Sequence, residues 1–552
     1  MNNIAATMDR PLHEARDVVI VGAGFAGLYM LYRLRELGMS VQVLEAADDV
    51  GGTWFWNRYP GARCDVESIE YSYSFSDELQ QEWKWTERYA AQPEILRYIQ
   101  HVADRFRLRQ HIRFQTRVKV AEFDPDANRW TVETDKGDRI TAPICIMATG
   151  CLSEARLPDI TGSETFRGRI FHTGKWPADE VSFRDRRVAV IGTGSSAIQL
   201  IPEIARQASK LFVFQRTANY CMPARNTQLN DQYQNDIESQ YAEVRNRARK
   251  APAGIAGWNI PDKSALEVSA EEREETFERY WKIGGAGFNR AYNDVLINPA
   301  ANELASDFLR RKISEVVLNP EVVEALTPTY PVGTKRLCTG TDYFETYNRP
   351  NVVLVDIRRT PIIEITDDGL RTEDDQYQFD DLVFSTGFDA MTGALLAMDI
   401  RIKGGLSLRQ VWAHGPVTYL GLMTAGFPNL FMITGPGSPS VFGNVVVAIE
   451  QHVEWIANCL DYMRSGGFTR IEAESAAQDN WVGHVNEVAD KTLVSKGNSW
   501  YVGANIPGKP RVFMPYIGGF HVYRQICDDV TAEGYRGFTF TVENAAQQLA
   551  NR

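Results

Sequence analysis

One segment near the start of the chain joins a short apolar strand, a glycine-rich turn and a helix. Residues 17–21 read DVVIV, which predicts a buried strand, and GAGFAG follows at 22–27. Residues 28–37 carry apolar side chains at helical spacing. Gly22 permits a tight turn, Gly24 lets a phosphate approach the backbone, and Gly27 lets the helix pack closely on the strand. The segment therefore predicts a βαβ unit that binds a dinucleotide.

Glu45 indicates which kind of dinucleotide this unit binds. The helix is expected to end at Gly38, a strand follows at 40–44, and Glu45 stands at its end. An acid about 20 residues after the glycines accepts a hydrogen bond from a ribose 2′-hydroxyl. The first unit is therefore expected to bind a plain ADP-ribose, as found in FAD or NAD.

A second unit of the same kind begins at residue 187. RVAVI at 187–191 predicts a strand, GTGSSA at 192–197 a turn, residues 198–205 a helix, and LFVF at 211–214 the next strand. Ala197 replaces the third glycine, and one methyl group still fits there. Arg216 follows the strand, where it would bind a 2′-phosphate that an acid would repel. This unit is predicted to bind NADPH; the alternative is that Arg216 is an ordinary solvated residue.

Length, charge and cysteine content limit the remaining possibilities. The chain has 552 residues, enough for two or three domains, and a net charge of -12. An acidic surface repels nucleic acids and anionic membranes, so neither is expected as a partner. Seven scattered cysteines without a CxxC pair, and no histidine cluster, indicate a cytoplasmic location and no metal site. Residues 1–17 resemble no targeting peptide and are expected to form a short disordered lead, and no apolar stretch is long enough to span a bilayer.

Four further segments carry motifs outside the nucleotide units. They are GGTWFWNRYPGARCD at 51–65, FRGRIFHTGKWP at 166–177, Thr334-Lys335-Arg336, and NSWYVGANIPGKPR at 498–511. The second matches the pattern FxGxxxHTxxW at every fixed position. Together these segments resemble the Baeyer–Villiger flavoprotein monooxygenases of class B, and the last is nearest to their phenylacetone and steroid monooxygenase branch.

The resemblance implies an enzyme that uses FAD, NADPH and O2. It would convert an aryl, cyclic or steroid-like ketone to an ester or lactone through a C4a-peroxyflavin, with sulfoxidation as a side activity. NADPH on the second unit would reduce FAD on the first, and NADP+ would stay bound to shield the flavin from water. The expected partner is a small-molecule ketone, and the expected state is a monomer or weak dimer.

The same resemblance assigns roles to individual residues. Arg336 is expected to stabilise the peroxide anion, because a guanidinium does not lose its proton, and Asp65 to position it. Lys335 is expected to join Arg216 and Thr217 around the 2′-phosphate. Trp500 is expected to contact the nicotinamide side, and His172 to act in a conformational hinge and not as a proton donor.

The complete predicted site falls into four groups. On the FAD side they are Gly22, Gly24, Phe25, Gly27, Glu45, Gly52, Thr53, Trp54, Trp56, Arg63, Asp65, Tyr71, Val118 and Val445. On the NADP side they are Thr193, Gly194, Ser195, Ser196, Ala197, Gln199, Arg216, Thr217, Lys335, Arg336 and Trp500. The hinge fingerprint is Phe166, Gly168, His172, Thr173 and Trp176, and the possible substrate pocket is Leu152, Val441 and Phe442. Phe442 is as readily explained as a buried core residue.

The expected fold is α/β, with two Rossmann-like domains, the second inserted in the first, and a helical insert. Strands that end in Thr-Gly, at 149–150 and 386–387, mark where the chain passes between the domains. Charged helical stretches fill 221–334, with a capping box at 269–272. The predicted division is an FAD-binding domain of 1–150 and 386–552, an NADP-binding domain of 151–220 and 335–385, and a helical insert of 221–334.

Three other functions share parts of this pattern. A flavin disulfide reductase needs a redox dithiol, and Cys64 has no nearby cysteine in the sequence. A non-catalytic NADPH-binding protein would be expected to lose the flavin-side or basic residues, which are all present. A flavin N- or S-oxygenase uses the same cofactors and remains the main alternative.

Overall fold

A five-stranded parallel sheet forms the first nucleotide fold in the computed structural model, which describes residues 13–542. Strand β2 lies between β8 and β3, and all four of its residues are buried. Such a run is apolar throughout because helices cover both faces of a parallel sheet. Helices α1 (Phe25–Glu36) and α14 (Val445–Gly466) pack together over it. The strands in order are β20 (Leu430–Met432), β8 (Ile144–Met147), β2 (Val18–Val21), β3 (Val41–Leu44) and β4 (Ile112–Arg113).

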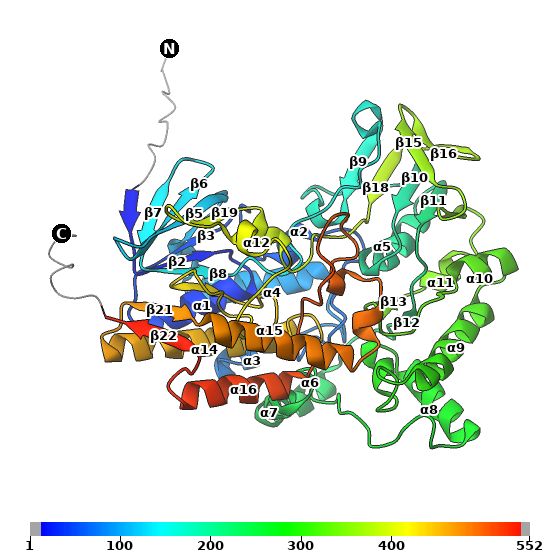
Figure 1. Cartoon of the computed structure of the whole chain (residues 1–552). Helices are drawn as coiled ribbons and strands as arrows, with labels where there is room; N and C mark the ends of the chain where they lie inside the picture. Colours follow the sequence, from blue (N-terminus) through cyan, green and yellow to red (C-terminus); the bar gives the residue numbers. More distant parts are fainter. Residues whose placement is uncertain (1–12, 543–552) are drawn as a thin grey trace, which may run out of the picture.

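A second parallel sheet repeats this arrangement. Strand β10 lies between β18 and β11 as β2 lies between β8 and β3, and helix α5 (Ser195–Ala205) follows it (Figure 1). The strands in order are β14 (Val352–Asp356), β11 (Lys210–Gln215), β10 (Arg187–Ile191), β18 (Asp381–Phe384) and β9 (Arg169–His172). The chain passes from the first sheet to the second between β8 and β9, and returns after β18. The predicted fold class, with the second fold inserted in the first, is confirmed.

Smaller sheets extend both folds. A mixed sheet of β1 (His13–Ala15), β7 (Arg139–Ala142), β6 (Arg129–Thr134), β5 (Val118–Asp124) and β19 (Asp399–Ile402) adjoins the first fold. An antiparallel sheet of β15 (Ile362–Thr366), β16 (Gly369–Thr372) and β17 (Gln376–Gln378) adjoins the second. Two pairs remain, β12 (Cys221–Pro223) with β13 (Cys338–Gly340), and β21 (Arg470–Ala473) with β22 (Phe538–Thr541).

The prediction of a disordered lead is wrong for residues 13–15. Strand β1 pairs in parallel with β7, and His13 lies opposite Arg139. Backbone hydrogen bonds to an existing strand edge order a segment whatever its side-chain charge, so composition gave no sign of it. Residues 1–12 lie outside the described part of the chain.

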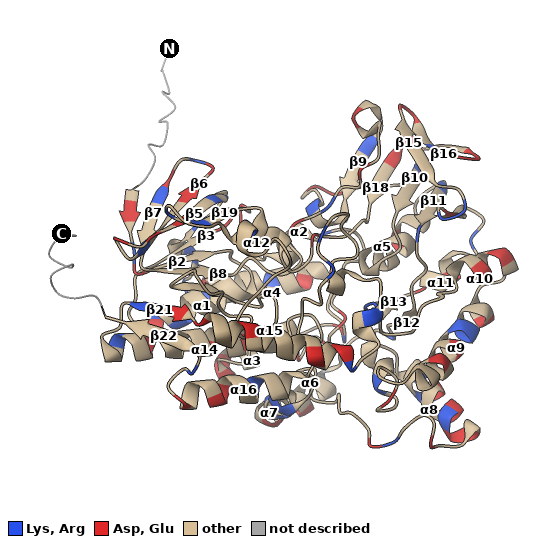
Figure 2. Ribbon diagram, in the orientation of Figure 1, with Lys and Arg blue, Asp and Glu red and all other residues tan. Residues whose placement is uncertain are grey.

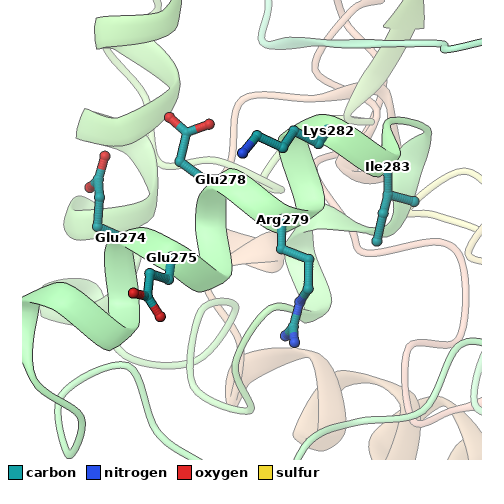
Figure 3. Close-up of a pocket in the computed structure, with 6 residues that line it drawn as sticks. All are labelled: Glu274, Glu275, Glu278, Arg279, Lys282 and Ile283. Atoms are coloured by element: carbon teal, nitrogen blue, oxygen red, sulfur yellow. The ribbon is translucent and has the colours of Figure 1, made fainter.

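The helical insert has its own aromatic core and a charged outer face. Phe277, Phe288 and Phe308 are buried against one another there. Charges of both signs follow α8 and α9 (Figure 2), and the hollow on α8 is lined by that helix alone (Figure 3). Glu278 in this hollow pairs with Lys312 of α9, so the charges there serve helix packing. The helices are α6 (Asp231–Glu238), α7 (Tyr241–Lys250), α8 (Ala270–Ile283), α9 (Pro299–Val316) and α10 (Pro320–Leu326).

Half of the predicted capping box is present at the start of α8. The Ser269 side chain accepts a hydrogen bond from the backbone N–H of Glu272, 3.2 Å away. The reciprocal bond is missing, because the Glu272 carboxylate pairs with Lys263 instead. A lysine brought near by the fold thus outcompetes the local capping partner.

The C-terminal segment closes the first fold with helices α14, α15 (Ser475–Asp490) and α16 (Phe520–Ala532). In residues 13–542 no helix combines the length and apolarity needed to cross a membrane. The remaining helices are α2 (Thr53–Trp56), α3 (Asp77–Glu82), α4 (Gln92–Arg105), α11 (Tyr343–Thr346), α12 (Gly393–Leu396) and α13 (Leu408–Val411).

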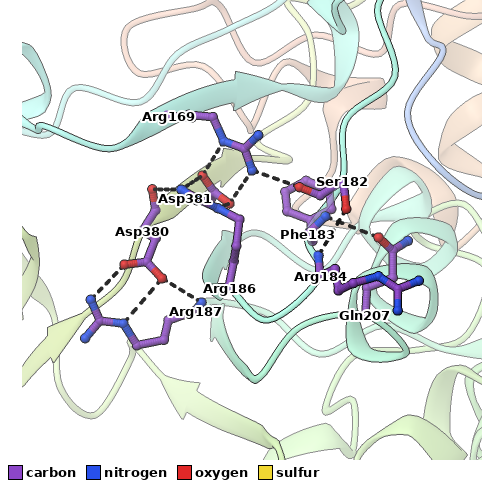
Figure 4. Close-up of polar contacts among 9 residues, drawn as sticks. All are labelled: Arg169, Ser182, Phe183, Arg184, Arg186, Arg187, Gln207, Asp380 and Asp381. Atoms are coloured by element: carbon purple, nitrogen blue, oxygen red, sulfur yellow. Dashed lines mark hydrogen bonds and ion pairs between the residues drawn. The ribbon is translucent and has the colours of Figure 1, made fainter.

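A buried ion cluster ties strand β9 to its neighbours (Figure 4). Asp381, at the start of β18, is fully buried and accepts hydrogen bonds from Arg169 (2.7 Å) and Arg186 (2.9 Å). The adjacent Asp380 pairs with Arg187 at 2.8 Å, but both of these side chains are a third or more exposed. Asp381 therefore fixes strand β9, which lies within the 166–177 segment.

We expect Asp381→Asn to lower the free energy of unfolding by about 2–3 kcal/mol, because it leaves two arginines without a buried anionic partner. Asp380→Asn is the matched control and is expected to cost less than about 1 kcal/mol, because water screens its ion pair. Urea denaturation followed by tryptophan fluorescence measures both values. Equal losses would contradict this account of the cluster.

Candidate active site

The first glycine turn leaves room for backbone contacts only. Gly22 has φ +106°, and a Cβ there would lie 2.5 Å from the carbonyl oxygen of Ala148 at the end of β8. A Cβ on Gly27 would lie 1.8 Å from the carbonyl oxygen of Gly22. Gly24 faces Gly52, whose Cα would be 3.3 Å from an added Cβ. The turn, its helix and the 51–65 segment thus converge at one point.

The second glycine turn has the same geometry. Gly192 has φ +111°, and a Cβ there would lie 2.3 Å from the carbonyl oxygen of Ser385 at the end of β18. Around Gly194 no described atom lies within 4 Å of an added Cβ. The open space sits at the N-terminus of α5, where backbone N–H groups favour a phosphate. The cradle therefore fits a dinucleotide.

Residues of opposite charge follow the second strand of each nucleotide fold, Glu45 after β3 and Arg216 after β11. Glu45 is buried and accepts hydrogen bonds from the backbone N–H groups of Ala23 (2.6 Å) and Ala47 (2.8 Å), while burial raises its pKa. Arg216 is exposed, and the described residues give it no ion pair or hydrogen bond. Burial, and then the charge of Arg216, lower the pKa of Lys335. Two neighbouring cations without an anion suit a 2′-phosphate.

The remaining NADP-side residues surround this turn. Thr193 donates a hydrogen bond to the carbonyl oxygen of Thr217 at 2.8 Å, which holds the turn against the strand end that carries Arg216. Ser195 contacts the sulfur of Cys338 at 3.2 Å. Ser195, Ser196 and Ala197 form the first turn of α5.

Residues predicted on the FAD side gather around the 51–73 segment. The indole N–H of Trp54 donates to the hydroxyl of Tyr71 (3.2 Å), and the Tyr71 ring packs edge-on against Phe25 at 5.5 Å. Thr53 and Trp56 lie in the short helix α2. Val118 and Val445 lie apart from this cluster in the sequence, at the starts of β5 and α14.

The two folds meet where helix α5 packs on the 59–63 segment. The Gln199 side chain accepts a hydrogen bond from the hydroxyl of Tyr59 (2.9 Å) and donates one to the carbonyl oxygen of Arg63 (3.1 Å). The Arg63 guanidinium pairs with Glu87 at 2.7 Å. Gln199 and Arg63, predicted on opposite cofactor sides, therefore form one contact between the folds.

Most residues of the 166–177 fingerprint are packing residues. Phe166 packs on Phe379, and a Cβ on Gly168 would lie 2.3 Å from the carbonyl oxygen of Asp380. Trp176 is buried against Phe171, and its backbone N–H reaches the carbonyl oxygen of Trp56 in the first fold at 3.3 Å. The fingerprint thus forms a tightly packed bridge between the folds.

His172 is the polar member of that bridge. Its Nδ1 accepts a hydrogen bond from the backbone N–H of Gly174 (3.0 Å), and its Nε2 lies 3.1 Å from the carbonyl oxygen of Arg156. A carbonyl accepts only, so Nε2 carries the proton. Burial lowers the pKa of His172, which favours this neutral form. Because both ring nitrogens are engaged, His172 holds the bridge in place. The side chain of the neighbouring Thr173 is buried.

Arg336 and Asp65 form a bidentate ion pair. Arg336 Nε lies 2.9 Å and Nη2 2.7 Å from Asp65 Oδ2, and Nη2 lies 2.8 Å from Oδ1. Nη1 donates to the carbonyl oxygen of Val441 at 3.1 Å. The charge of Asp65 is the main cause that raises the pKa of Arg336, so the guanidinium stays charged. Asp65 thus holds one edge of the guanidinium in place.

A cavity of about 300 Å³ opens beside this ion pair. Its wall includes Asp65, Arg336, Val441 and Phe442. Phe442 both lines the cavity and packs on Tyr501 at 4.7 Å, so its two predicted roles coexist. Leu152 and Trp500 pack in the same apolar cluster but are not among the lining residues.

Sequence reasoning missed part of this wall. Tyr501 lies beside Arg336, and burial raises its pKa to about 12, so the phenol stays protonated. Trp258, Arg290 and Asn293 come from the helical insert. No motif marks these three insert positions, because only the packing of the insert brings them to the cavity, whereas Tyr501 lies in the 498–511 segment beside the predicted Trp500.

The chain is similar to known flavoproteins over nearly its whole length. Residues 19–292 match the family model described as pyridine nucleotide-disulphide oxidoreductase. A Baeyer–Villiger monooxygenase of Pseudooceanicola batsensis is 42% identical over 94% of this chain and 95% of its own length. A phenazine N-monooxygenase of Lysobacter antibioticus is 41% identical, over 95% and 96%. The solved structure of an oxidized steroid monooxygenase bound to NADP superposes with a TM-score of 0.92 at 51% identity, covering 96% of this chain and all of that one.

The open space at Gly194 leads to a prediction. Its backbone has φ -78°, which alanine adopts freely, so Gly194→Ala is expected to leave the melting temperature of the protein unchanged without nucleotide. The added methyl group would occupy the space for a pyrophosphate and is expected to weaken NADPH binding at least about tenfold. Calorimetry measures the binding.

Gly24→Ala provides the comparison in the first fold. Its added Cβ would crowd Gly52, so loss of retained flavin is expected there, with NADPH binding kept. Unchanged NADPH affinity in Gly194→Ala would contradict the assignment of the second turn.

Proposed function

The chain belongs to the Baeyer–Villiger monooxygenase family, and from this we propose how its residues divide the work of that reaction. The enzyme uses FAD, NADPH and O2 to insert one oxygen atom beside the carbonyl of a ketone. The products are an ester or lactone, NADP+ and water. The observation that carries the residue assignment is the Arg336–Asp65 ion pair on the wall of the cavity.

The two nucleotide folds take different cofactors in this proposal. Glu45 and the 51–73 segment hold FAD, since a carboxylate suits a free ribose hydroxyl. Arg216, Lys335 and Thr217 hold the 2′-phosphate of NADPH, with its pyrophosphate at Gly194. Trp500 takes the nicotinamide side. This order is supported by the buried Glu45 and by the unpaired cations of the second fold.

Arg336 is proposed as the catalytic residue. When bound, FAD supplies the redox chemistry that accepts a hydride from NADPH and activates O2. Attack on a carbonyl carbon needs an oxygen nucleophile that stays unprotonated, and a cation beside it favours that form. Arg336 keeps its charge, and Asp65 fixes its orientation while Nη1 is held by Val441. Asp65 is therefore a positioning residue.

His172 and its fingerprint neighbours are proposed to couple the folds mechanically. The ring is neutral and fully hydrogen-bonded, which supports a role in holding the bridge and argues against proton transfer. Trp176 contacts Trp56 of the first fold, so a shift of the bridge would move one cofactor site relative to the other.

An N-oxygenase is the second candidate, because a phenazine N-monooxygenase is nearly as similar to the chain as the ketone-oxidising relative. Oxygen transfer to nitrogen uses an electrophilic, protonated oxidant, for which a fixed cation is of less use. The charged Arg336 favours ketone oxidation. Incubation with a phenyl ketone, a cyclic ketone, a steroid ketone, an aryl sulfide and a phenazine, followed by mass spectrometry, distinguishes the two.

We also propose a cytoplasmic enzyme that acts as a monomer or weak dimer. The seven cysteines are free thiols, which supports a reducing compartment. Aryl, cyclic or steroid-like ketones are the proposed substrate range, with sulfoxidation as a side activity.

Arg336→Met is expected to reduce ester formation at least about 100-fold while NADPH oxidation continues and releases hydrogen peroxide. The variant keeps flavin reduction because it leaves both nucleotide turns intact. The measurement compares NADPH consumed with ester formed. Arg336→Met/Asp65→Asn controls for the unpaired carboxylate, and retained ester formation in either variant would overturn the role of Arg336.

Arg216→Glu is expected to lower the ratio of kcat/KM for NADPH to that for NADH at least about tenfold, because it replaces a phosphate-binding cation with an acid. Initial rates with each nucleotide and one ketone give this ratio. Arg206, paired with Glu203 on α5, supplies the control variant Arg206→Glu. An unchanged preference in Arg216→Glu would show that Arg216 is only a solvated residue.

A further inference from the structure

Arg290 presents a cation without an anion to the active-site cavity. It ends a short 3-10 segment of the helical insert (Ala286–Arg290) and lines the same cavity as Arg336. Within residues 13–542 its guanidinium has no ion pair and no hydrogen bond, and its one recorded contact is the ring of Trp258, 5.3 Å away. Among the described lining residues the one carboxylate is Asp65, whose two oxygens are taken by Arg336.

A buried arginine of the insert, Arg245, shows how this chain satisfies a guanidinium that is removed from water. Arg245 donates to Gln80 (2.9 Å), to Ser72 (2.7 Å) and to the carbonyl oxygen of Glu70 (3.1 Å). Arg290 has no such partners, and burial lowers its pKa to about 10, which leaves it charged at neutral pH. A partly desolvated cation without a partner costs stability. Such a cost is typical of a group kept for a ligand.

The surroundings of Arg290 differ from those of the 2′-phosphate site. Arg216, which marks the 2′-phosphate site, is not among the described residues that line the cavity, whereas Arg290 is. Two apolar side chains, Ile260 and Ile297, line the same cavity as Arg290 and are 57% and 53% exposed. A ligand in this cavity meets apolar side chains, the amides of Asn289 and Asn293, and the Arg290 cation, while Lys335 and Arg336 line other parts of the same wall.

We propose that Arg290 is a specificity-determining residue that binds a carboxylate on the substrate, so that the preferred ketones are keto acids with an apolar spacer. Arg336 lines the reacting end of the cavity and Arg290 the anion-binding end. The Trp258 ring lies 5.3 Å from the guanidinium, whose planar fork can donate two hydrogen bonds to a carboxylate. This inference rests on the proposed function.

The test compares methyl ketones that end in a carboxylate, with spacers of increasing length, against their methyl esters. For the best spacer, the wild type is expected to favour the acid over the ester at least about tenfold in kcat/KM. In Arg290→Met that preference falls at least about tenfold, while kcat/KM for the ester stays within about twofold. Arg290→Lys keeps the charge without the bidentate geometry and lies between them.

Two further readouts separate this role from a structural one. The thermal midpoint of Arg290→Met is expected to equal or exceed that of the wild type, because an unpaired, partly buried cation is removed. Calorimetry on the oxidised holoenzyme with NADP+ is expected to show binding of the keto acid that Arg290→Met loses. Calorimetry measures binding without turnover, so the result does not depend on whether the ketone is oxidised. If the methionine variant does not fold, the same titration is done with Arg290→Lys.

Three results would overturn the proposal. The first is an acid-to-ester preference that is the same in the wild type and in Arg290→Met, or absent from the wild type at every spacer length. The second is a higher KM for NADPH in Arg290→Met with both ketones alike, which would place Arg290 at the nucleotide. The third is a lowered thermal midpoint with unchanged ligand binding. Failure of the proposed function differs from all three, since neither acid nor ester would then yield product.

Discussion

In both nucleotide folds, the glycine turn packs against a backbone carbonyl group at the end of a neighbouring strand of the sheet. Gly22 meets Ala148 and Gly192 meets Ser385, and in both cases a side chain would collide with the carbonyl oxygen. Each contact lies at the carboxyl end of a parallel sheet, where ligands bind in such folds. The chain leaves each sheet directly after Ala148 and Ser385, so the crossings between the folds start at the ligand edge of both. The two binding edges and the bridge between them therefore form one region.

Pairing of charges separates structural cations from ligand-binding ones in this region. Arg169, Arg186 and Arg245 each have buried partners and hold elements together. Arg216, Lys335 and Arg290 have no carboxylate among the described residues. Arg336 is intermediate, since Asp65 orients it while it faces the cavity. In a chain of net charge -12, cations left without partners in a cleft are a costly feature that a bound anion would offset.

Local patterns predicted the parts of the structure that depend on neighbours in sequence. The strands, glycine turns and helices of both folds follow from apolar runs and from the steric needs of single glycines. Strand β1 depends on a partner far away in sequence, Arg139, and the missing half of the capping box at Ser269 depends on Lys263, which lies outside the local capping pattern, so neither was predicted correctly. Resemblance indicated the pair of Arg336 and Asp65, since their separation in the sequence gives no local signal. Packing of the insert brings Trp258 and Arg290 to the cavity wall, and no motif in the sequence marks these two residues.

The ion pair beside the reacting atoms and many of the residues that line the cavity come from different parts of the chain. The Arg336–Asp65 pair joins the 51–65 segment to the turn after the insert, and both are anchored by the nucleotide folds. Many of the other lining residues come from the insert, whose aromatic core is separate from those folds. Changes in the insert can therefore alter the cavity without disturbing the cation beside the reacting atoms. A Baeyer–Villiger monooxygenase and a phenazine N-monooxygenase of similar identity to this chain are compatible with such a layout, since one fold can carry different substrate sites.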